Sequence, residues 1–329
     1  MWFQKLFGFY EQSPGQVREQ IVIDGELMSS RKNGKSYRYG RLETPTLADL
    51  RLQVRSAKPI PGKLTLREVV ADAGELHGEE ANAGALFQVA SQFNLLEMAS
   101  SDVTPEEGVD IYENDHTQGP ACAVACGAGT VYRNYFAGVN GRTGQSKDNQ
   151  IDCLSDIGLA LDNTGNRLWE MKNGYALATE EGLGEIKNKL SDAREVEIDN
   201  LRGLLRIGIQ WDTEVTIPNA GHTVTQAYCS ALPVGYSSHP QELWAEFARL
   251  ILDATYEATF CAAALNSLKT GNNKMYLTLV GGGVFENKTE WILGAIHRSI
   301  ELYKDVGLDV NIVSYGKSNE NVKKLIQMI

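Results

Sequence analysis

The clearest folding signal in this sequence lies near its C-terminal end. The run MYLTLV at 275–280 has the residue types of a buried strand, and GGGVFE at 281–286 is a glycine loop. An amphipathic helix, WILGAIHRSIELYKD, and a second strand, VNIVSYG, follow, with Asn287 and Glu290 as an N-cap pair. Because a strand, a helix and a strand in this order place both strands parallel in one sheet, the segment predicts an α/β fold with a right-handed crossover.

Other segments also indicate regular structure. The apolar run ALFQVA at 85–90 predicts a buried strand. Residues 239–268 predict a long helix, since their apolar side chains recur at spacings of three and four. Thr65 and Glu68 form a capping-box pattern that predicts a short helix over LREVVAD. A further helix of small residues is expected over 120–136, because proline favours the first turn of a helix.

The residue pattern divides the chain into a short N-terminal part and a larger body. Residues 1–60 are rich in turn signals and are expected to form an N-terminal layer, and 61–329 the main domain. Within the latter, 138–215 reads as an insertion, because a polar loop is followed by two short β-type runs around Asn173 and Gly174. An Asn-Gly pair between such runs predicts a hairpin turn.

Composition excludes several classes of protein. The formal net charge of −11 repels phosphate backbones, so nucleic acid is not an expected partner. No stretch approaches the roughly 20 apolar residues that a bilayer requires, and the opening MWFQKLFGFY is too short and too interrupted for a signal peptide. The five cysteines lack a C-x-x-C pair, which predicts free thiols in a reducing compartment and a cytoplasmic protein without membrane contact.

The glycine loop is a candidate phosphate site. A glycine-rich turn between a strand and a helix exposes backbone N–H groups near the positive end of the helix, and an anion can approach them closely. The loop is not a Walker A motif, and Glu286 breaks the Rossmann pattern, which argues against P-loop hydrolysis and nicotinamide chemistry. The alternative is that Gly281, Gly282 and Gly283 only make a tight turn.

Two segments resemble macrodomains of the poly(ADP-ribose) glycohydrolase branch. The segment from YLTLVGGGVFE to VNIVSYG resembles their closing βαβ unit, in which a glycine-rich loop followed by an aromatic residue wraps the diphosphate of ADP-ribose. GALFQVASQFN at 84–94 resembles the strand of that branch that ends in an asparagine contacting the distal ribose, and Asn94 occupies this position. The resemblance covers about residues 64–136 and 224–316.

The resemblance implies a three-layer α/β/α fold with a mixed sheet, an N-terminal extension and a hairpin insertion. Its cleft would lie at the C-terminal ends of the central strands. Asp72 would accept the adenine amino group, although by spacing alone it is an ordinary helix-end residue, and Phe285 would face a ribose or adenine or else anchor the loop. The implied ADP-ribose site consists of Asp72, Gln92, Asn94, Gln118, Gly119, Gly281, Gly282, Gly283, Val284 and Phe285.

The catalytic loop departs from that branch. Its GGG…QEE pattern is missing, and an acidic segment that is more similar to divergent, arginine-directed (MavL-type) macrodomain hydrolases stands in its place. Cleavage at C1″ of the distal ribose passes through an oxocarbenium-like ribose, which carboxylates stabilise while they orient a water. The resemblance implies that this segment lies over the distal ribose near Asn94. Asp115 and Glu113, which are closest to the helix start, and then Asp110 are therefore the candidate catalytic residues. The alternative is that this acidic run is a solvated loop.

Other functions are compatible with the same residues. Cys122, close to a helix N-terminus, is an alternative nucleophile with His116 as its base, or else a small apolar core residue. No histidine and cysteine array has metal-site spacing, so no metal site and no cofactor are expected, although an acidic loop is able to hold Ca²⁺ or Mg²⁺. The preferred function is ADP-ribosyl hydrolysis, particularly from arginine. Its rivals are an ADP-ribose reader without turnover and a metal-dependent nucleotide-diphosphate phosphohydrolase.

Overall fold

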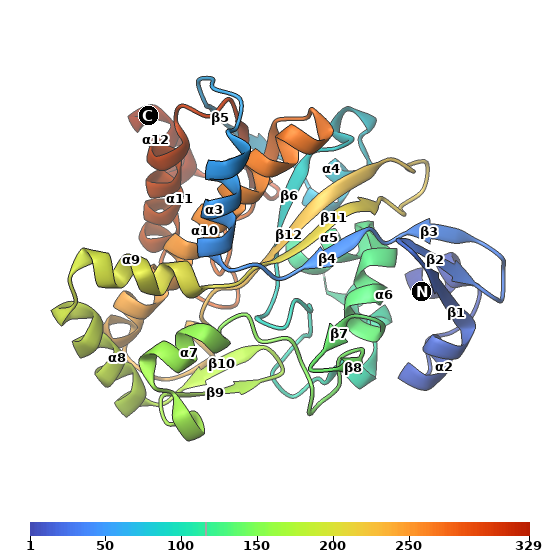
Figure 1. Ribbon diagram of the computed structural model, residues 1–329, viewed down its shortest axis with the longest axis horizontal. Helices are drawn as coiled ribbons and strands as arrows, with labels where there is room; N and C mark the ends of the chain where they lie inside the picture. Colours follow the sequence, from blue (N-terminus) through green and yellow to red (C-terminus); the bar gives the residue numbers. More distant parts are fainter. Residues whose placement is uncertain (116) are drawn as a thin grey trace.

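A seven-stranded sheet forms the centre of the protein (Figure 1). The computed structural model describes residues 1–115 and 117–329. Four neighbouring strand pairs, from β12 through β6, β13 and β14 to β5, are parallel, whereas β11 is antiparallel to both β12 and β4. In spatial order the strands are β4 (Arg41–Glu43), β11 (Gly208–Glu214), β12 (Thr223–Cys229), β6 (Leu86–Ala90), β13 (Lys274–Leu277), β14 (Asp309–Ser314) and β5 (Thr65–Val70).

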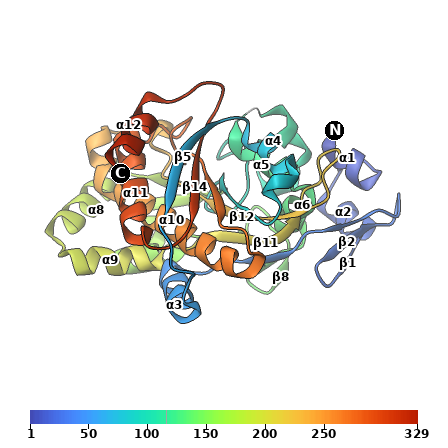
Figure 2. The same cartoon turned by 90° about the horizontal axis from the view of Figure 1, so that it is seen from above.

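Helices cover both faces of this sheet. One face carries α4 (Ala73–Gly78), α5 (Gln118–Ala125) and α6 (Gly127–Tyr135) (Figure 2). The other carries α10 (Gln241–Thr270), α11 (Thr289–Tyr303) and α12 (Glu320–Met328), and α3 (Leu47–Ala57) packs against α10. The predicted three-layer α/β/α architecture with a mixed sheet is therefore confirmed.

The C-terminal βαβ unit forms as its apolar runs predict. β13 and β14 pair in parallel from Lys274 opposite Asp309 to Leu277 opposite Ile312, and α11 connects them. β14 is buried at all but its first residue. Continuous burial is typical of parallel strands that are covered on both faces. The predicted strand at 85–90 is likewise β6, in the middle of the sheet.

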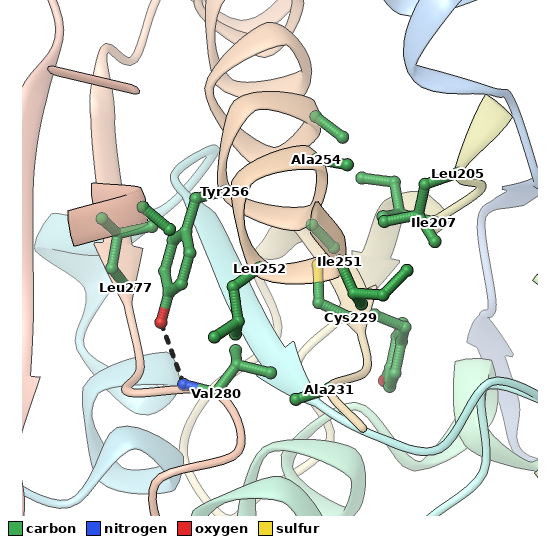
Figure 3. Packing of buried hydrophobic residues seen from close by; sticks show 14 of the residues in the cluster. Leu205, Ile207, Cys229, Ala231, Ile251, Leu252, Ala254, Tyr256, Leu277 and Val280 are labelled. Atoms are coloured by element: carbon green, nitrogen blue, oxygen red, sulfur yellow. Dashed lines mark hydrogen bonds between the residues drawn. The ribbon is translucent and has the colours of Figure 1, made fainter. Parts of the chain in front are cut away.

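The long helix α10 supports the centre of the sheet (Figure 3). Ile251 and Leu252 point from it toward the strands, and both are fully buried. Burying such a side chain contributes about 1.5–3 kcal/mol to stability. The Tyr256 hydroxyl accepts a hydrogen bond from the Val280 N–H at 3.0 Å and donates one to the Thr278 carbonyl at 2.8 Å. This pair of bonds fixes the chain where β13 ends and the glycine loop begins.

The elements within residues 1–38 lie outside the central sheet and are termed the N-terminal layer. Its apolar side chains share a second hydrophobic core with α5, α6 and the loop that precedes α5. However, β4 and α3 within residues 1–60 join the central sheet and α10. The boundary at residue 60 stays a prediction. The layer consists of α1 (Trp2–Phe7), α2 (Pro14–Gln20) and an antiparallel sheet of β1 (Ile21–Asp24), β2 (Leu27–Ser30) and β3 (Ser36–Arg38).

The segment expected to be an insertion contains the predicted hairpin. Asn173 and Gly174 have φ values of 46° and 81°, as a two-residue turn between twisted strands requires. β11 belongs to the central sheet, so the part outside that sheet ends before Gly208. The elements are β7 (Gly138–Val139), β8 (Arg142–Thr143), α7 (Ser155–Leu161), β9 (Trp169–Lys172), β10 (Tyr175–Ala178), α8 (Glu180–Asp192) and α9 (Glu195–Leu204).

Two helix predictions were wrong in detail. The residues from Thr65 form edge strand β5, which pairs with β14 over six positions, and these bonds replace a helix. Glu68 does not complete a capping box, because its carboxylate accepts from the Ser314 hydroxyl and the Asn319 N–H. The helix expected over 120–136 is two helices, α5 and α6, because Cys126 between them has φ −117° and ψ 60°.

All five cysteines are free and buried, as expected for thiols without disulfide partners. Their burial makes them small apolar members of the core. In the part of the chain that the structure describes, no helix is both long and apolar enough to span a bilayer.

Candidate active site

The glycine loop 281–286 follows β13, at the C-terminal ends of the parallel strands. Gly281 has φ 78°, and a Cβ atom there would come within 2.5 Å of the Ala231 Cβ atom, so this position requires glycine. Asn287 is not the N-cap that the sequence predicts, and α11 has no side-chain cap. The side-chain amide of Asn287 instead donates to the Leu232 carbonyl at 2.8 Å. The loop is therefore braced against the segment that follows β12.

Three consecutive backbone amides of this loop have no hydrogen-bond partner among the described residues. The turns within the loop use the N–H groups of Gly282 and Glu286. Those of Gly283, Val284 and Phe285 donate to no residue that the structure describes. Gly282, Gly283 and Val284 are exposed. Unpaired N–H groups on an exposed turn are able to donate to an anion.

An aromatic cluster joins the glycine loop to the insertion. The rings of Tyr175, Tyr236 and Phe285 meet pairwise, with centroids 5.1–5.6 Å apart. Phe285 is only 8% exposed, so it anchors the loop, one of the two roles that the sequence leaves open. Tyr236 is 38% exposed and gives the cluster an open side. Sequence reasoning missed both tyrosines, because only the folded chain brings the hairpin to this edge of the sheet.

Gln92 and Asn94 lie just beyond the end of β6 but are closed off from solvent. The Gln92 amide accepts from the Met98 N–H at 2.8 Å and donates to the Met98 carbonyl at 3.2 Å. Asn94 is fully buried, and its side chain donates to Gln150 Oε1 at 2.8 Å and accepts from the Leu96 N–H at 3.1 Å. The predicted contact of Asn94 with a ribose therefore requires its surroundings to move.

The hairpin turn covers Asn94. Gln150 accepts from Asn94 and donates to the Asn173 side-chain oxygen, in both cases at 2.8 Å. Asn173 also donates to the Ser101 carbonyl at 2.7 Å, and the Phe93 N–H donates to the Gly174 carbonyl at 3.0 Å. This amide network fastens the insertion to the loop that follows β6.

Two of the three predicted catalytic carboxylates contact the N-terminal layer. Glu113 accepts from the Trp2 backbone N–H at 2.9 Å. Asp110 accepts from the Phe3 N–H at 3.2 Å, and burial raises the pKa of this carboxyl. Asp110 Oδ2 is buried without a partner among the described residues. Both side chains thus face the N-terminal layer, whereas the predicted cleft would lie at the C-terminal ends of the central strands.

Asp115 is the predicted carboxylate that stands next to α5. Its Oδ1 accepts from the Thr117 N–H at 2.8 Å, and the residue is partly exposed. Since α5 begins at Gln118, the carboxylate lies where the first N–H groups of the helix are unpaired. Of the three acids, Asp115 alone combines this position with access to solvent.

A fourth carboxyl group, Glu97, interacts through its charge with Asp115 and was missed by the sequence analysis. Glu97 is 5% exposed, and its Oε1 has no partner among the described residues. Its Oε2 lies against the Cα face of Gly119, since a Cβ atom there would come within 2.6 Å of it. Burial raises the pKa of Glu97 well above its ordinary value, the charge of Arg133 opposes this, and Asp115 adds to it. A charged residue inside the apolar run LLEM was the available signal.

The predicted adenine and ribose residues Asp72 and Gln118 bond to each other. Gln118 donates to Asp72 Oδ2 at 3.3 Å and accepts from the Ala73 N–H at 2.7 Å. Asp72 is the N-cap of α4 rather than the end of a helix, because its Oδ1 accepts from the Gly74 N–H at 2.7 Å. These bonds join the starts of α4 and α5. Gly119, the second residue of α5, is buried against the Ala90 carbonyl and the Glu97 carboxyl group.

The thiol alternative is not supported. Cys122 is fully buried, and burial raises the pKa of its thiol well above the ordinary value. A thiol that stays protonated and inaccessible is a poor nucleophile. Its proposed base, His116, lies outside the described residues.

No group of three or more histidine, cysteine, aspartate or glutamate side chains within the described ranges is arranged to hold a metal ion. Two open grooves of about 710 and 700 Å³ lie away from the candidate residues. The first runs beside β4 and α3, and the second lies between α11 and α12.

The chain thus has a three-layer α/β/α fold with an exposed glycine loop and a buried carboxyl group near the C-terminal ends of its central strands. No family model and no curated protein matches the sequence. Among solved structures, it is similar to poly(ADP-ribose) glycohydrolase from Deinococcus radiodurans in complex with ADP-ribose, with 12% identity, 87% of this chain and 90% of that chain covered, and a TM-score of 0.45. It is also similar to the Thermomonospora curvata glycohydrolase bound to the inhibitor ADP-HPD, with 11% identity, 95% of each chain and a TM-score of 0.43.

Proposed function

We propose that this protein hydrolyses the bond between ADP-ribose and a modified protein side chain, with arginine as the linked residue. Three unpaired amides, an aromatic cluster and the acids Glu97 and Asp115 lie near the C-terminal ends of the central strands. This observation carries the proposal. Tyr175 connects these parts. Its ring meets Phe285 at 5.4 Å, and burial, then Tyr236, then the charges of Glu97 and Asp115 raise the pKa of its hydroxyl.

The amides of Gly283, Val284 and Phe285 bind the diphosphate in this proposal. The distal ribose then extends past Tyr236 toward Asp115 and Gln92. Asn94 contacts the ribose only after the hairpin turn has moved away from it, because its amide oxygen and nitrogen are each bonded and the turn covers them. Asp72 and Gln118 stay proposed ligand contacts near the start of α5.

The two carboxyl groups would divide the proton transfers. Water attacks C1″ as the C1″–N bond to the leaving group breaks, and Asp115 accepts a proton from that water. Glu97 retains a proton to higher pH than an ordinary glutamate, because burial raises its pKa. It is therefore suited to supply the proton that leaves with the side-chain nitrogen. A carboxyl group whose surroundings raise its pKa is a recurring candidate for the general acid.

An arginine-linked substrate fits this acidic centre. A guanidinium is planar and positively charged, and its N–H groups pair with two carboxylate oxygens. The partly exposed Asp115 offers a carboxylate to this guanidinium, and the orphaned Glu97 Oε1 offers the carbonyl oxygen of a protonated carboxyl group.

The decisive experiment compares binding and turnover in the same preparation. Calorimetry with ADP-ribose should detect binding, and an arginine-linked substrate should be cleaved faster than serine- or glutamate-linked ones. Asp115→Asn is expected to bind ADP-ribose normally and to lose activity by roughly 100-fold or more. Glu113→Gln, in the same loop but facing Trp2, is the matched control and should retain activity. Absence of ADP-ribose binding by the wild-type protein would refute the proposal.

A reader that binds ADP-ribose without cleaving it is the second candidate. The burial of Asn94 beneath the hairpin favours the reader, since a protein whose ribose site stays closed does not cleave a bond at the distal ribose. Binding with no cleavage of any of the three linkages would establish this reader. A metal-dependent phosphohydrolase would instead lose activity in the presence of a chelator.

A further inference from the structure

The side chain of Glu11 holds the acidic loop in place. Its Oε2 accepts from the backbone N–H groups of Val109 at 2.9 Å and of Asp110 at 2.6 Å. Its Oε1 accepts from the Tyr135 hydroxyl of α6 at 2.6 Å. Three donors therefore converge on one carboxylate, and they come from the acidic loop and from the helix behind it.

The loop is shaped to receive this carboxylate. Gly108 has φ 91°, and a Cβ atom there would come within 2.5 Å of Glu11 Oε2. A side chain at this position would displace the carboxylate, so the close approach depends on glycine. An ionised carboxylate, which only accepts hydrogen bonds, matches all three donors, whereas an amide matches fewer.

Two neighbouring hydrogen bonds also join the N-terminal layer to the acidic loop. The indole N–H of Trp2 donates to the Val109 carbonyl at 3.3 Å, and the Phe3 N–H donates to Asp110. Val109 and Phe3 are fully buried in the second hydrophobic core. The N-terminal layer thus contacts the loop through both its backbone and its apolar side chains.

We propose that Glu11 is a positioning residue, through which the N-terminal layer holds the loop that carries Asp115 in its working place at the start of α5. This inference rests on the proposed function, because it assigns the layer a role in that reaction. Glu11 itself does not touch the substrate. Its contribution is the position of the loop backbone, and displacement of catalytic groups by about 1 Å is able to cost on the order of 100-fold in rate.

The test replaces Glu11 with glutamine and compares it with Glu19→Gln. Glu19 is exposed on α2 in the same layer, and its side chain has no hydrogen bond or ion pair with a described residue, so it is a matched control. For Glu11→Gln we expect kcat to fall by roughly 10- to 100-fold with KM for the arginine-linked substrate changed less than about twofold. Hydrogen exchange at Val109 and Asp110 should become faster in this variant only.

Three results would overturn the inference. They are unchanged kcat per folded molecule in Glu11→Gln, an equal loss in Glu19→Gln, and unchanged exchange at the loop amides. If Glu11→Gln does not fold, Tyr135→Phe removes one of the three bonds and should give the same effects on a smaller scale. A wild-type protein without turnover would instead refute the proposed function, and the exchange measurement would still decide whether Glu11 holds the loop.

Discussion

The backbone of Gly174 rests directly on the side chain of Asn94. A Cβ atom at Gly174 would come within 2.5 Å of Asn94 Oδ1 and within 2.6 Å of the Gln92 Cβ atom. The turn of the insertion and the end of β6 are thereby in contact, although the two segments lie far apart in sequence. This contact determines whether the candidate ribose residue is open or covered.

Gly174→Ala is therefore expected to destabilise the fold and loosen the hairpin. The φ of 81° and the contact with Asn94 both disfavour a side chain, and we expect a loss of about 1–3 kcal/mol in the free energy of unfolding. Gly141→Ala is the control, because Gly141 has φ 75° but no atom within 4 Å of its Cβ position. Urea unfolding should show the larger loss at Gly174. Equal losses would mean that backbone strain, and not the contact, dominates.

Substitutions in the glycine loop should separate folding from ligand binding. Gly281→Ala would bring its Cβ atom against Ala231, so thermal stability and ADP-ribose affinity should both fall. Gly283→Ala has free space around its Cβ position, so stability should be nearly unchanged. Affinity should still fall by about tenfold if a diphosphate lies against this exposed turn. Calorimetry beside thermal unfolding tests this, and normal affinity in Gly283→Ala would remove the loop from the binding site.

Glu97→Gln should lower activity without lowering stability at neutral pH. Because the pKa of Glu97 is raised on folding, the folded chain binds more protons than the unfolded chain above pH 4.5, and stability falls as pH rises through that window. Glutamine does not ionise and escapes this loss. Melting temperatures from pH 5 to 8 should therefore shift in favour of the variant with rising pH, while turnover is reduced. A constant difference in melting temperature would indicate that Glu97 is ionised beside Arg133 throughout.

His77 should make the protein sensitive to acid. The ring is fully buried, with Nδ1 2.6 Å from the Ala73 carbonyl oxygen, and burial lowers its pKa from 6.5 to about 4. Between these values the unfolded chain binds more protons, so the stability that neutral His77 contributes is complete above pH 6.5 and is lost as pH falls to about 4. At about 1.4 kcal/mol per pH unit, the loss approaches about 3 kcal/mol. Unfolding of His77→Gln should show a shallower slope across this range, and an identical slope would assign the effect to another group.

Local patterns predicted much of the fold correctly. The strands around the glycine loop, the strand that leads to Asn94 and the Asn173-Gly174 turn all appear as expected, because apolar runs and turn residues act over a few neighbouring positions. Thr65 and Glu68 show the limit of such patterns. Their capping-box spacing indicates a helix, but pairing with β14 makes the segment a strand, and Glu68 bonds to residues near the other end of the chain.

The candidate site was less predictable than the fold. Glu113 and Asp110 have the right residue type, yet their oxygens face the N-terminal layer. Glu97 gave only a weak signal, and Tyr175 and Tyr236 gave none. Each of these outcomes depends on which distant segment lies opposite the side chain.

Residue patterns alone were enough to specify an α/β body with a glycine loop at the end of a strand, since hydrophobic burial and turn geometry are encoded over short stretches. Folding in three dimensions decided the chemistry available at that edge. It buried Asn94 beneath the hairpin and brought Glu97 against Gly119 at the start of α5. The physical reason is that hydrogen bonding and desolvation of a polar group depend on all the neighbours that surround it, and most of those neighbours come from remote parts of the chain.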